Sequence, residues 1–231
     1  MGILSKRKMG EEAETKSEFE VNFHFPTSDK ALLIFTRNPE MGKCKTRLAA
    51  TVGDDAALHI YKFLLRHTAE ITETLKVDKF VYYSEGLHTE DVWDDNRYTK
   101  RTQHGNDLGA RMENAFAEVF ASGYRKVIII GSDLYDLSQT DLENAFQKLN
   151  DHDFVVGPAE DGGYYLLGMK SLKPELFAHK NWGTETVLED TLKDMKTESV
   201  AQLDLRNDVD YFEDIKDIEA FQRFLPKSLK E

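Results

Sequence analysis

Cysteine and long apolar runs are nearly absent from this chain. Cys44 is the only cysteine among the 231 residues, so no internal disulfide can form and nothing indicates an oxidising compartment. No stretch approaches the roughly 18 apolar residues that a membrane-spanning helix needs, and the N-terminus lacks the apolar segment of a signal peptide. We therefore expect a cytoplasmic protein that has no membrane span.

Positive charge is also scarce. Lysine and arginine number 30 against 42 acidic residues, which gives a formal net charge of -12. Nucleic acids are bound through basic surfaces, so this acidic excess argues against DNA or RNA as a partner. A nucleotide needs only a local group of cations, and the composition leaves nucleotide binding open.

The N-terminal residues differ from the rest of the chain. Residues 1–17 are charged and aperiodic, which is typical of a mobile tail. Apolar residues then occupy every second position, at Phe19, Val21, Phe23 and Phe25. This alternation predicts a half-buried strand, either at the sheet edge or as an arm onto a partner subunit in a homodimer. We predict an N-terminal extension over residues 1–28 and a single domain over residues 29–231.

Short apolar runs alternate with stretches of helical periodicity along most of the chain. Strands are expected at residues 31–35, 79–83, 127–130, 154–156, 164–169 and 200–205. Helices are expected at residues 54–76, 138–149 and 185–196, with another that ends near residue 120. Such alternation predicts the α/β class with a mixed sheet.

The clearest strand, at residues 127–130, ends in Gly131 and Ser132 and is followed at once by Asp133. In open α/β sheets, ligands bind beyond the carboxyl ends of the strands. Asp133 is therefore a candidate ligand for a divalent metal or a substrate. Aspartate also begins many turns, so a purely structural cap is an equal alternative.

The loop after the strand at residues 31–35 concentrates positive charge. Its basic residues are Arg37, Lys43, Lys45 and Arg47. A glycine in the loop allows close backbone approach, and the start of the following helix offers free N–H groups. The loop lacks the spacing of a P-loop. Solvated surface cations are the alternative, but a basic cluster in so acidic a chain favours an anion site.

Four other residues carry local signals of structure or chemistry. Arg111 follows a glycine-rich loop and would reach a phosphate or pair with Asp107. Asp161 begins an Asp-Gly-Gly segment, which is a hairpin signal in its own right. Asp210 would cap the final helix. Lysines on both sides would lower the pKa of Cys44, although no base for a nucleophile is identified.

Five segments follow one another in an order that resembles a known family. They lie at residues 35–48, 105–112, 131–133, 157–164 and 182–184, and the first and fourth are the most specific. The family is that of small bacterial glycosyltransferase-like proteins with a GT-A, or nucleotide-diphospho-sugar transferase, fold. It includes enzymes assigned to arsenosugar biosynthesis and is distantly related to the 2-phospho-lactate guanylyltransferases. The resemblance spans residues 31–218, nearly the whole chain after the tail.

The resemblance implies a three-layer α/β/α sandwich with a mostly parallel sheet and a nucleotide site at the strand ends. The implied nucleotide- and phosphate-binding residues are Arg37, Lys43, Lys45, Thr46, Arg47 and Arg111. The implied ligands of Mg²⁺ or Mn²⁺ are Asp133 and Asp210, and the implied catalytic residues are Asp133 and Asp161. The implied acceptor-binding residues are Tyr164, Trp182 and Thr184. Tyr135 replaces the proline that the family usually has, which predicts a less rigid loop after Asp133.

We predict a metal-dependent transferase that passes the sugar of a nucleotide-sugar to a small acceptor. A nucleotidyltransferase that joins an NTP to a phosphorylated small molecule is the first alternative. Both activities need the same phosphate loop and metal, and they differ in the bond that breaks. A non-catalytic nucleotide-binding protein is the second alternative.

Overall fold

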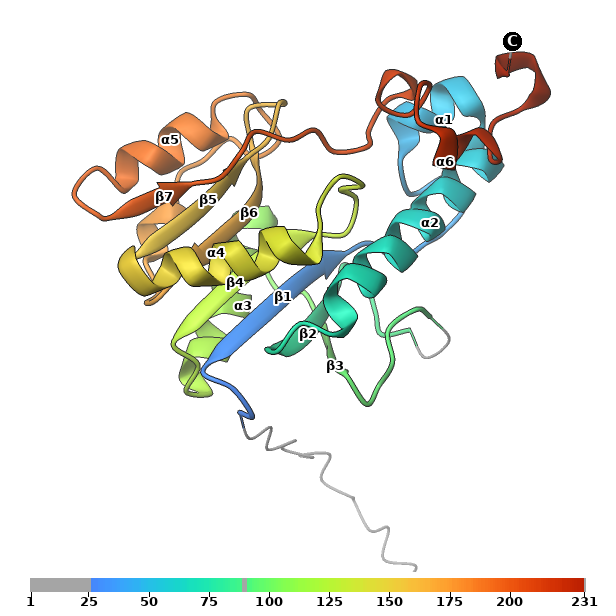
Figure 1. The fold of residues 1–231 in the computed structure, drawn as a ribbon. Coiled ribbons are helices and arrows are strands. Elements are labelled where there is room, and N and C mark those ends of the chain that lie inside the picture. The colour runs from blue at the N-terminus through green and yellow to red at the C-terminus, as the bar shows by residue number, and fades with distance from the viewer. Residues whose placement is uncertain (1–25, 89–90, 231) are drawn as a thin grey trace, which may run out of the picture.

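The computed structural model describes residues 26–88 and 91–230 (Figure 1). The strand predicted near residues 19–25 lies outside the described residues, so the sheet-edge and homodimer predictions stay predictions. In the described part of the chain, no helix is both long enough and apolar enough to cross a membrane.

The described residues form one seven-stranded sheet with the order β3-β2-β1-β4-β6-β5-β7. The strands are β1 (Lys30–Thr36), β2 (Asp78–Tyr83), β3 (Tyr98–Thr102), β4 (Lys126–Gly131), β5 (Phe154–Pro158), β6 (Tyr164–Met169) and β7 (Val200–Gln202). Strand β6 runs antiparallel to both of its neighbours, and the other pairings are parallel. The predicted mixed, mostly parallel sheet is therefore confirmed. The sequence gives little signal for β3, because only Tyr98 of its five residues is buried.

Helices cover both faces of the sheet. The α-helices are α1 (Thr46–Val52), α2 (Asp54–Glu73), α3 (Leu108–Ala121), α4 (Gln139–Asp151), α5 (Val187–Asp194) and α6 (Glu219–Gln222). Successive side chains of a strand point to opposite faces, so Leu32 and Ile34 pack with α2 and α4, whereas Ala31 and Leu33 pack with α3. The result is the three-layer α/β/α arrangement.

The C-terminal strap, defined as residues 203–211, leaves β7 and crosses the sheet to the side of α1 (Figure 1). Backbone hydrogen bonds fix its path: Leu203 donates to the carbonyl of Val156 at 2.8 Å, and Val209 donates to the carbonyl of Asp133 at 3.2 Å. Beyond the strap, Phe221 packs with α1 and α2. The strap thus carries residues 208 and 210 over the end of β4.

Tyr135 anchors the loop that follows β4. Its ring centroid lies 4.9 Å from that of Phe221, 5.0 Å from His67 and 5.7 Å from Phe63. Aromatic pairs at such distances stabilise beyond their buried area. Aromatic packing of Tyr135 therefore holds the loop after Asp133. The prediction that this loop is less rigid considered only the missing proline and not this packing.

Candidate active site

The site consists of two adjoining cavities at the carboxyl ends of the parallel strands. The first, which we call the polar cleft, has a volume of about 770 Å³. It is lined by all six of the predicted nucleotide- and phosphate-binding residues: Arg37, Lys43, Lys45, Thr46, Arg47 and Arg111. Asp133, Asp161 and Asp210 also line it. The fold thus brings these residues together, while their roles stay predictions.

Lys45 lies between the two predicted metal ligands, Asp133 and Asp210. Its Nζ is 2.8 Å from Asp133 Oδ2 and 3.4 Å from Asp210 Oδ1, and its side chain is only 5% exposed. Arg47 reaches the second oxygen of Asp210 at 2.6 Å. Asp133 and Asp210 therefore converge on one point, as predicted, but the group between them is an ammonium of the chain itself.

The Lys45–Asp133 pair is charged on both sides. Burial would raise the pKa of Asp133, but the Lys45 ammonium and its hydrogen bond outweigh burial, so this pKa lies below its usual value. Burial would lower the pKa of Lys45, but Asp133 and Asp210 outweigh it and raise that pKa. Because Lys45 is only 5% exposed, removing its carboxylate partners would strand an ammonium with poor access to water, which typically costs about 3–5 kcal/mol.

The backbone of Lys45 is itself in an unfavourable conformation. Its φ is 50° and its ψ is 45°, which is the left-handed region, and it precedes the first residue of α1. A residue with a side chain adopts this region at a cost of about 1–3 kcal/mol, and such residues concentrate at functional sites. The left-handed backbone of Lys45 is consistent with the predicted phosphate-binding role of this residue, which stays a prediction.

The donor set at this point suits a divalent ion only in part. Two carboxylates supply hard oxygen ligands, and Mg²⁺ often binds through one or two carboxylates together with substrate phosphates. In the residues that the structure describes, no three His, Cys, Asp or Glu side chains are grouped to hold a metal. Asp133 and Asp210 therefore fit a divalent ion that nucleotide phosphates complete, provided that the Lys45 ammonium moves away.

Sequence reasoning missed a fourth carboxylate, Asp208. It lines both cavities, and its pKa is raised to about 6, first because it is buried and then because Asp133 and Asp210 are close. The signal was present in the Asp208-Val209-Asp210 pattern. Alternate residues of an extended segment face the same side, and Val209 is buried at 3% exposure on the other side. Asp208 therefore joins Asp210 at the site.

Replacing Asp208 with asparagine is expected to stabilise the protein above about pH 6. The folded pKa of about 6 exceeds the ordinary value of 3.8, so ionisation opposes folding. This destabilisation is absent below pH 3.8, grows between the two pKa values and is complete above about pH 6. Because Asp208 is partly solvated, we expect a gain of about 1–2 kcal/mol at pH 8. Thermal melts in EDTA from pH 4 to pH 8 measure it.

Asp204→Asn supplies the matched control, because Asp204 is exposed on the same strap. It should change the melting temperature little at any pH. Equal effects of Asp208→Asn at pH 4 and pH 8 would contradict the assignment of the destabilisation to the buried charge.

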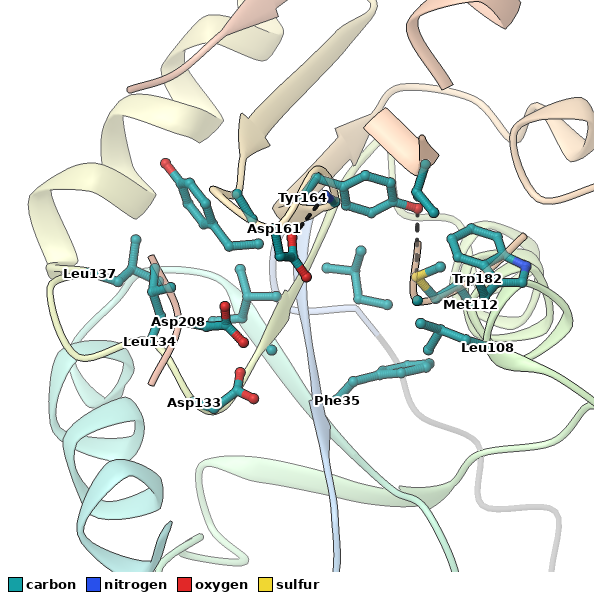
Figure 2. Close-up of a pocket in the computed structure, with 18 of the residues that line it drawn as sticks. Phe35, Leu108, Met112, Asp133, Leu134, Leu137, Asp161, Tyr164, Trp182 and Asp208 are labelled. Atoms are coloured by element: carbon teal, nitrogen blue, oxygen red, sulfur yellow. Dashed lines mark hydrogen bonds between the residues drawn. The ribbon is translucent and has the colours of Figure 1, made fainter. Parts of the chain in front are cut away.

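The second cavity, which we call the apolar chamber, has a volume of about 230 Å³ (Figure 2). The three predicted acceptor-binding residues, Tyr164, Trp182 and Thr184, all line it. Its other lining residues include Phe35, Leu108, Met112, Leu134, Leu137 and Val187. Asp133, Asp161 and Asp208 line both the chamber and the polar cleft, and Figure 2 shows their carboxylates in a row.

Close packing sets the positions of the aromatic side chains in the chamber. A Cβ on Gly109 would lie 2.5 Å from Trp182 Nε1, so the indole rests directly on the start of α3. The hydroxyl of Tyr164 donates only weakly, to Met112 Sδ at 3.9 Å. Burial raises the pKa of Tyr164, so its hydroxyl stays neutral at ordinary pH. Trp182 and Tyr164 therefore present a largely apolar wall.

The structure confirms the hairpin interpretation of Asp161, and its catalytic role stays a prediction. The predicted hairpin is confirmed, since β5 and β6 pair in antiparallel register on either side of it. Asp161 Oδ1 accepts a hydrogen bond from the backbone N–H of Gly163 at 2.8 Å. Gly162 has a φ of 85°, and a Cβ there would lie 2.2 Å from the carbonyl oxygen of Glu185. The turn chemistry thus fixes a carboxylate that lines both cavities.

Two structural expectations are wrong. Asp210 does not cap a helix; instead its N–H donates to Asp214 Oδ2 at 2.8 Å, which leaves its carboxylate for Lys45 and Arg47. The pKa of the Cys44 thiol is raised, because burial outweighs the nearby Lys45. The Cys44 thiol is therefore not activated as a nucleophile.

Arg111 does not form the ion pair with Asp107 that was one of its two predicted interactions. Its guanidinium donates to the carbonyl of Gly105 at 3.2 Å and to Gln103 Oε1 at 3.4 Å. Asp107 instead caps α3, where it accepts from the N–H of Ala110 at 2.8 Å. Arg111 is thereby positioned along the wall of the polar cleft.

Comparison with known proteins identifies a family and several structures to which the chain is similar. Residues 67–184 match the family described as "Uncharacterized protein conserved in bacteria (DUF2064)". A crystal structure of a "putative nucleotide-diphospho-sugar transferase" from Desulfovibrio desulfuricans G20 is 32% identical in sequence and has a TM-score of 0.78. That similarity covers 85% of this chain and 91% of the other. No curated protein matches the sequence.

More distant structures share the fold. A cytidylyltransferase from Leptospira borgpetersenii is 16% identical with a TM-score of 0.57, over 88% of this chain and 90% of its own. The 4-diphosphocytidyl-2C-methyl-D-erythritolsynthase from Anaerococcus prevotii is 10% identical with a TM-score of 0.55, over 84% and 97%. Together with the closer match, they confirm the predicted nucleotide-diphospho-sugar transferase-like fold.

Proposed function

The chain belongs to the DUF2064 family, and we propose that it is a nucleotide-dependent transferase that passes the sugar of a nucleotide-sugar donor to a small acceptor. The observation that carries this proposal is the pair of cavities: a cleft rich in cations adjoins an apolar chamber, and Asp133, Asp161 and Asp208 line both. The similarity to the structure from Desulfovibrio desulfuricans supports it. A closer relation to the arsenosugar or guanylyltransferase enzymes stays a prediction.

The polar cleft would bind the donor. Lys45, Arg47 and Arg111 would donate charge-assisted hydrogen bonds to the phosphates. Asp133 and Asp210 would hold Mg²⁺ or Mn²⁺ once Lys45 exchanges its carboxylate partners for phosphate oxygens. Such an ion would neutralise charge on the departing diphosphate.

The apolar chamber would place the acceptor against the donor. A bond forms between the acceptor oxygen and the anomeric carbon, while the bond from that carbon to the diphosphate breaks and the diphosphate keeps the electron pair. Asp161 would orient the acceptor hydroxyl and accept its proton, which then passes to solvent. Because Asp161 lines both cavities, its carboxylate would be placed to take part in this proton transfer.

A ligand panel tests the proposal. Thermal melts with nucleotide-sugars and with NTPs, each with and without Mn²⁺, report binding. A nucleotide-sugar at about 100 times its dissociation constant adds about 2.7 kcal/mol, a shift of about 5–10 °C for a domain of this size. Stabilisation by NTPs alone would favour the nucleotidyltransferase. Stabilisation by neither class would overturn the proposal.

Arg47→Ala is expected to weaken nucleotide binding about tenfold or more, because a charge-assisted hydrogen bond contributes about 1.5–3 kcal/mol. Isothermal titration calorimetry with the ligand selected by the panel measures this loss. Lys148→Ala is the control, because Lys148 is an exposed cation on α4 outside the cleft. Equal affinities of both variants would exclude Arg47 from the phosphate site.

A further inference from the structure

The walls of the apolar chamber are unusual for a site that handles sugars. Phe35, Leu108, Met112, Trp182 and Tyr164 form one side of it (Figure 2). Hydroxyl-rich ligands lose water when they enter such a space and need hydrogen-bonding partners in return. The side-chain hydroxyl of Thr184 is already used locally, since it donates to the carbonyl of Asn181 at 2.8 Å. The chamber therefore suits an apolar body.

The charges of the chamber are all of one sign. None of the described residues that line it is Lys, Arg or His, whereas Asp133, Asp161 and Asp208 all line it. Lys45 offsets Asp133. Within the described chain, Asp161 and Asp208 have no ion-pair partner, although Asp161 accepts from the backbone of Gly163. A phosphate that entered would meet three carboxylates, of which only Asp133 has a cation within ion-pair distance.

The polar cleft shows the contrast. Six acidic residues line it, including the three shared with the chamber, but so do five cations: Arg37, Lys43, Lys45, Arg47 and Arg111. The polar cleft thus offers cations to a phosphate group, whereas the apolar chamber, on the other side of the carboxylate row, offers none. At about 4 Å and at the effective dielectric constant of a protein surface, like charges repel by more than the equivalent of a tenfold change in affinity.

From this division we infer that the acceptor is an uncharged alcohol with a small apolar body, and that phosphorylated acceptors are excluded from the chamber. The inference rests on the proposed function and narrows it, because the nucleotidyltransferase alternative requires a phosphorylated acceptor. The volume of about 230 Å³ is below the range of about 300–1,000 Å³ that is usual for drug-sized ligands. The apolar body is therefore small, about the size of one ring.

Fluorescence of Trp182 provides a direct readout without turnover. The chain has two tryptophans, and Trp93 lies in the core at 3% exposure. In a Trp93→Phe background, emission therefore reports on the chamber alone. Three probes are titrated without nucleotide: 2-phenylethanol, 2-phenylethyl phosphate and methyl β-D-glucopyranoside. If Trp93→Phe fails to fold, calorimetry on the unmodified chain measures the same three affinities.

We expect 2-phenylethanol to bind at least about tenfold more tightly than its phosphate ester. It should also bind at least about tenfold more tightly than the glycoside, whose hydroxyls would be left without partners. Equal or tighter binding of either competitor, or the absence of binding by the alcohol, would overturn the inference.

A positive charge introduced into the wall of the apolar chamber tests whether the probes bind there. Leu108 lines the chamber and is 45% exposed, so Leu108→Lys should be tolerated by the fold. It should improve binding of the phosphate ester at least about tenfold and weaken binding of the alcohol. Leu205→Lys is the matched control, because Leu205 is 60% exposed and lies outside both cavities. Unchanged affinities in Leu108→Lys would show that the probes bind elsewhere, which also overturns the inference.

The nucleotide panel separates this failure from that of the proposed function. Retained nucleotide binding with no preference for the alcohol would refute the inference alone. Preference for the alcohol in a chain that binds no nucleotide would refute the proposed function and the acceptor assignment that depends on it, while the ligand preference of the chamber would stand.

Discussion

Lys45→Met is expected to change two affinities in opposite directions. Nucleotide affinity should fall at least about tenfold, because a charge-assisted contact to phosphate is lost. Mn²⁺ affinity without nucleotide should rise at least about tenfold, because Asp133 and Asp210 lose the ammonium that now lies 2.8 Å and 3.4 Å from them. Calorimetry with nucleotide and electron paramagnetic resonance with Mn²⁺ measure the two changes.

The physical reason is that the space between Asp133 and Asp210 can hold either the Lys45 ammonium or Mn²⁺, but not both. A unit charge at about 4 Å contributes about 4 kcal/mol at the effective dielectric constant of a protein surface, which is ample for the expected gain. Without Mn²⁺, the variant should also be less stable by about 1–2 kcal/mol, because Asp133 loses its ammonium partner, although water reaches this carboxylate and Asp210 keeps Arg47. Added Mn²⁺ should restore part of that stability.

Lys43→Met controls for the loss of one positive charge in the same cleft. Lys43 pairs with Glu40 at 2.7 Å and is 59% exposed, so its removal should leave Mn²⁺ affinity unchanged. An increase in both variants would indicate a general effect of charge. Unchanged Mn²⁺ affinity in Lys45→Met would mean that Asp133 and Asp210 do not form an ion site.

The local elements could be predicted because each is encoded within a few residues. Ser138 is predicted to cap a helix, and the structure shows a full capping box with Asp141. Strand β6 has the predicted bounds, Tyr164–Met169, because apolar residues fill it between a turn and a charged residue. Strand β3 was missed because its half-buried polar residues resemble a loop.

The convergence of the site residues could be predicted only where the topology rule applies. Asp133 follows β4, so its place at the strand end was expected. The contact of Lys45 with Asp210 depends on the path of the C-terminal strap, which is set by long-range hydrogen bonds such as Val209 to Asp133. Contacts between distant segments carry no local signal, and this is why the ammonium between the carboxylates was not foreseen.

The charged state of the site was equally inaccessible from the sequence. The flanking lysines suggest a lowered pKa for Cys44, yet burial reverses the direction. Asp208 looks like one of many acidic residues until the fold places it between the two cavities. Burial is a property of the assembled core, so pKa directions followed only from the structure.

The remaining prediction concerns Asp161, for which turn chemistry and catalysis make different demands. Asp161→Asn keeps the oxygen that accepts from the N–H of Gly163 at 2.8 Å, so the turn and the melting temperature should be nearly unchanged. What asparagine removes is the negative charge at the junction of the two cavities.

Turnover of Asp161→Asn should fall at least about 100-fold, since a positioned general base usually contributes about 10²–10⁴-fold in rate. Release of nucleoside diphosphate from the donor, with 2-phenylethanol as acceptor, measures the loss, and nucleotide affinity should remain normal. Glu160→Gln is the control, because it removes an adjacent, exposed charge outside both cavities. Near-native turnover of Asp161→Asn would mean that Asp161 serves only the turn. The asparagine oxygen still accepts the hydrogen bond from the backbone N–H of Gly163, but it cannot take the acceptor's proton.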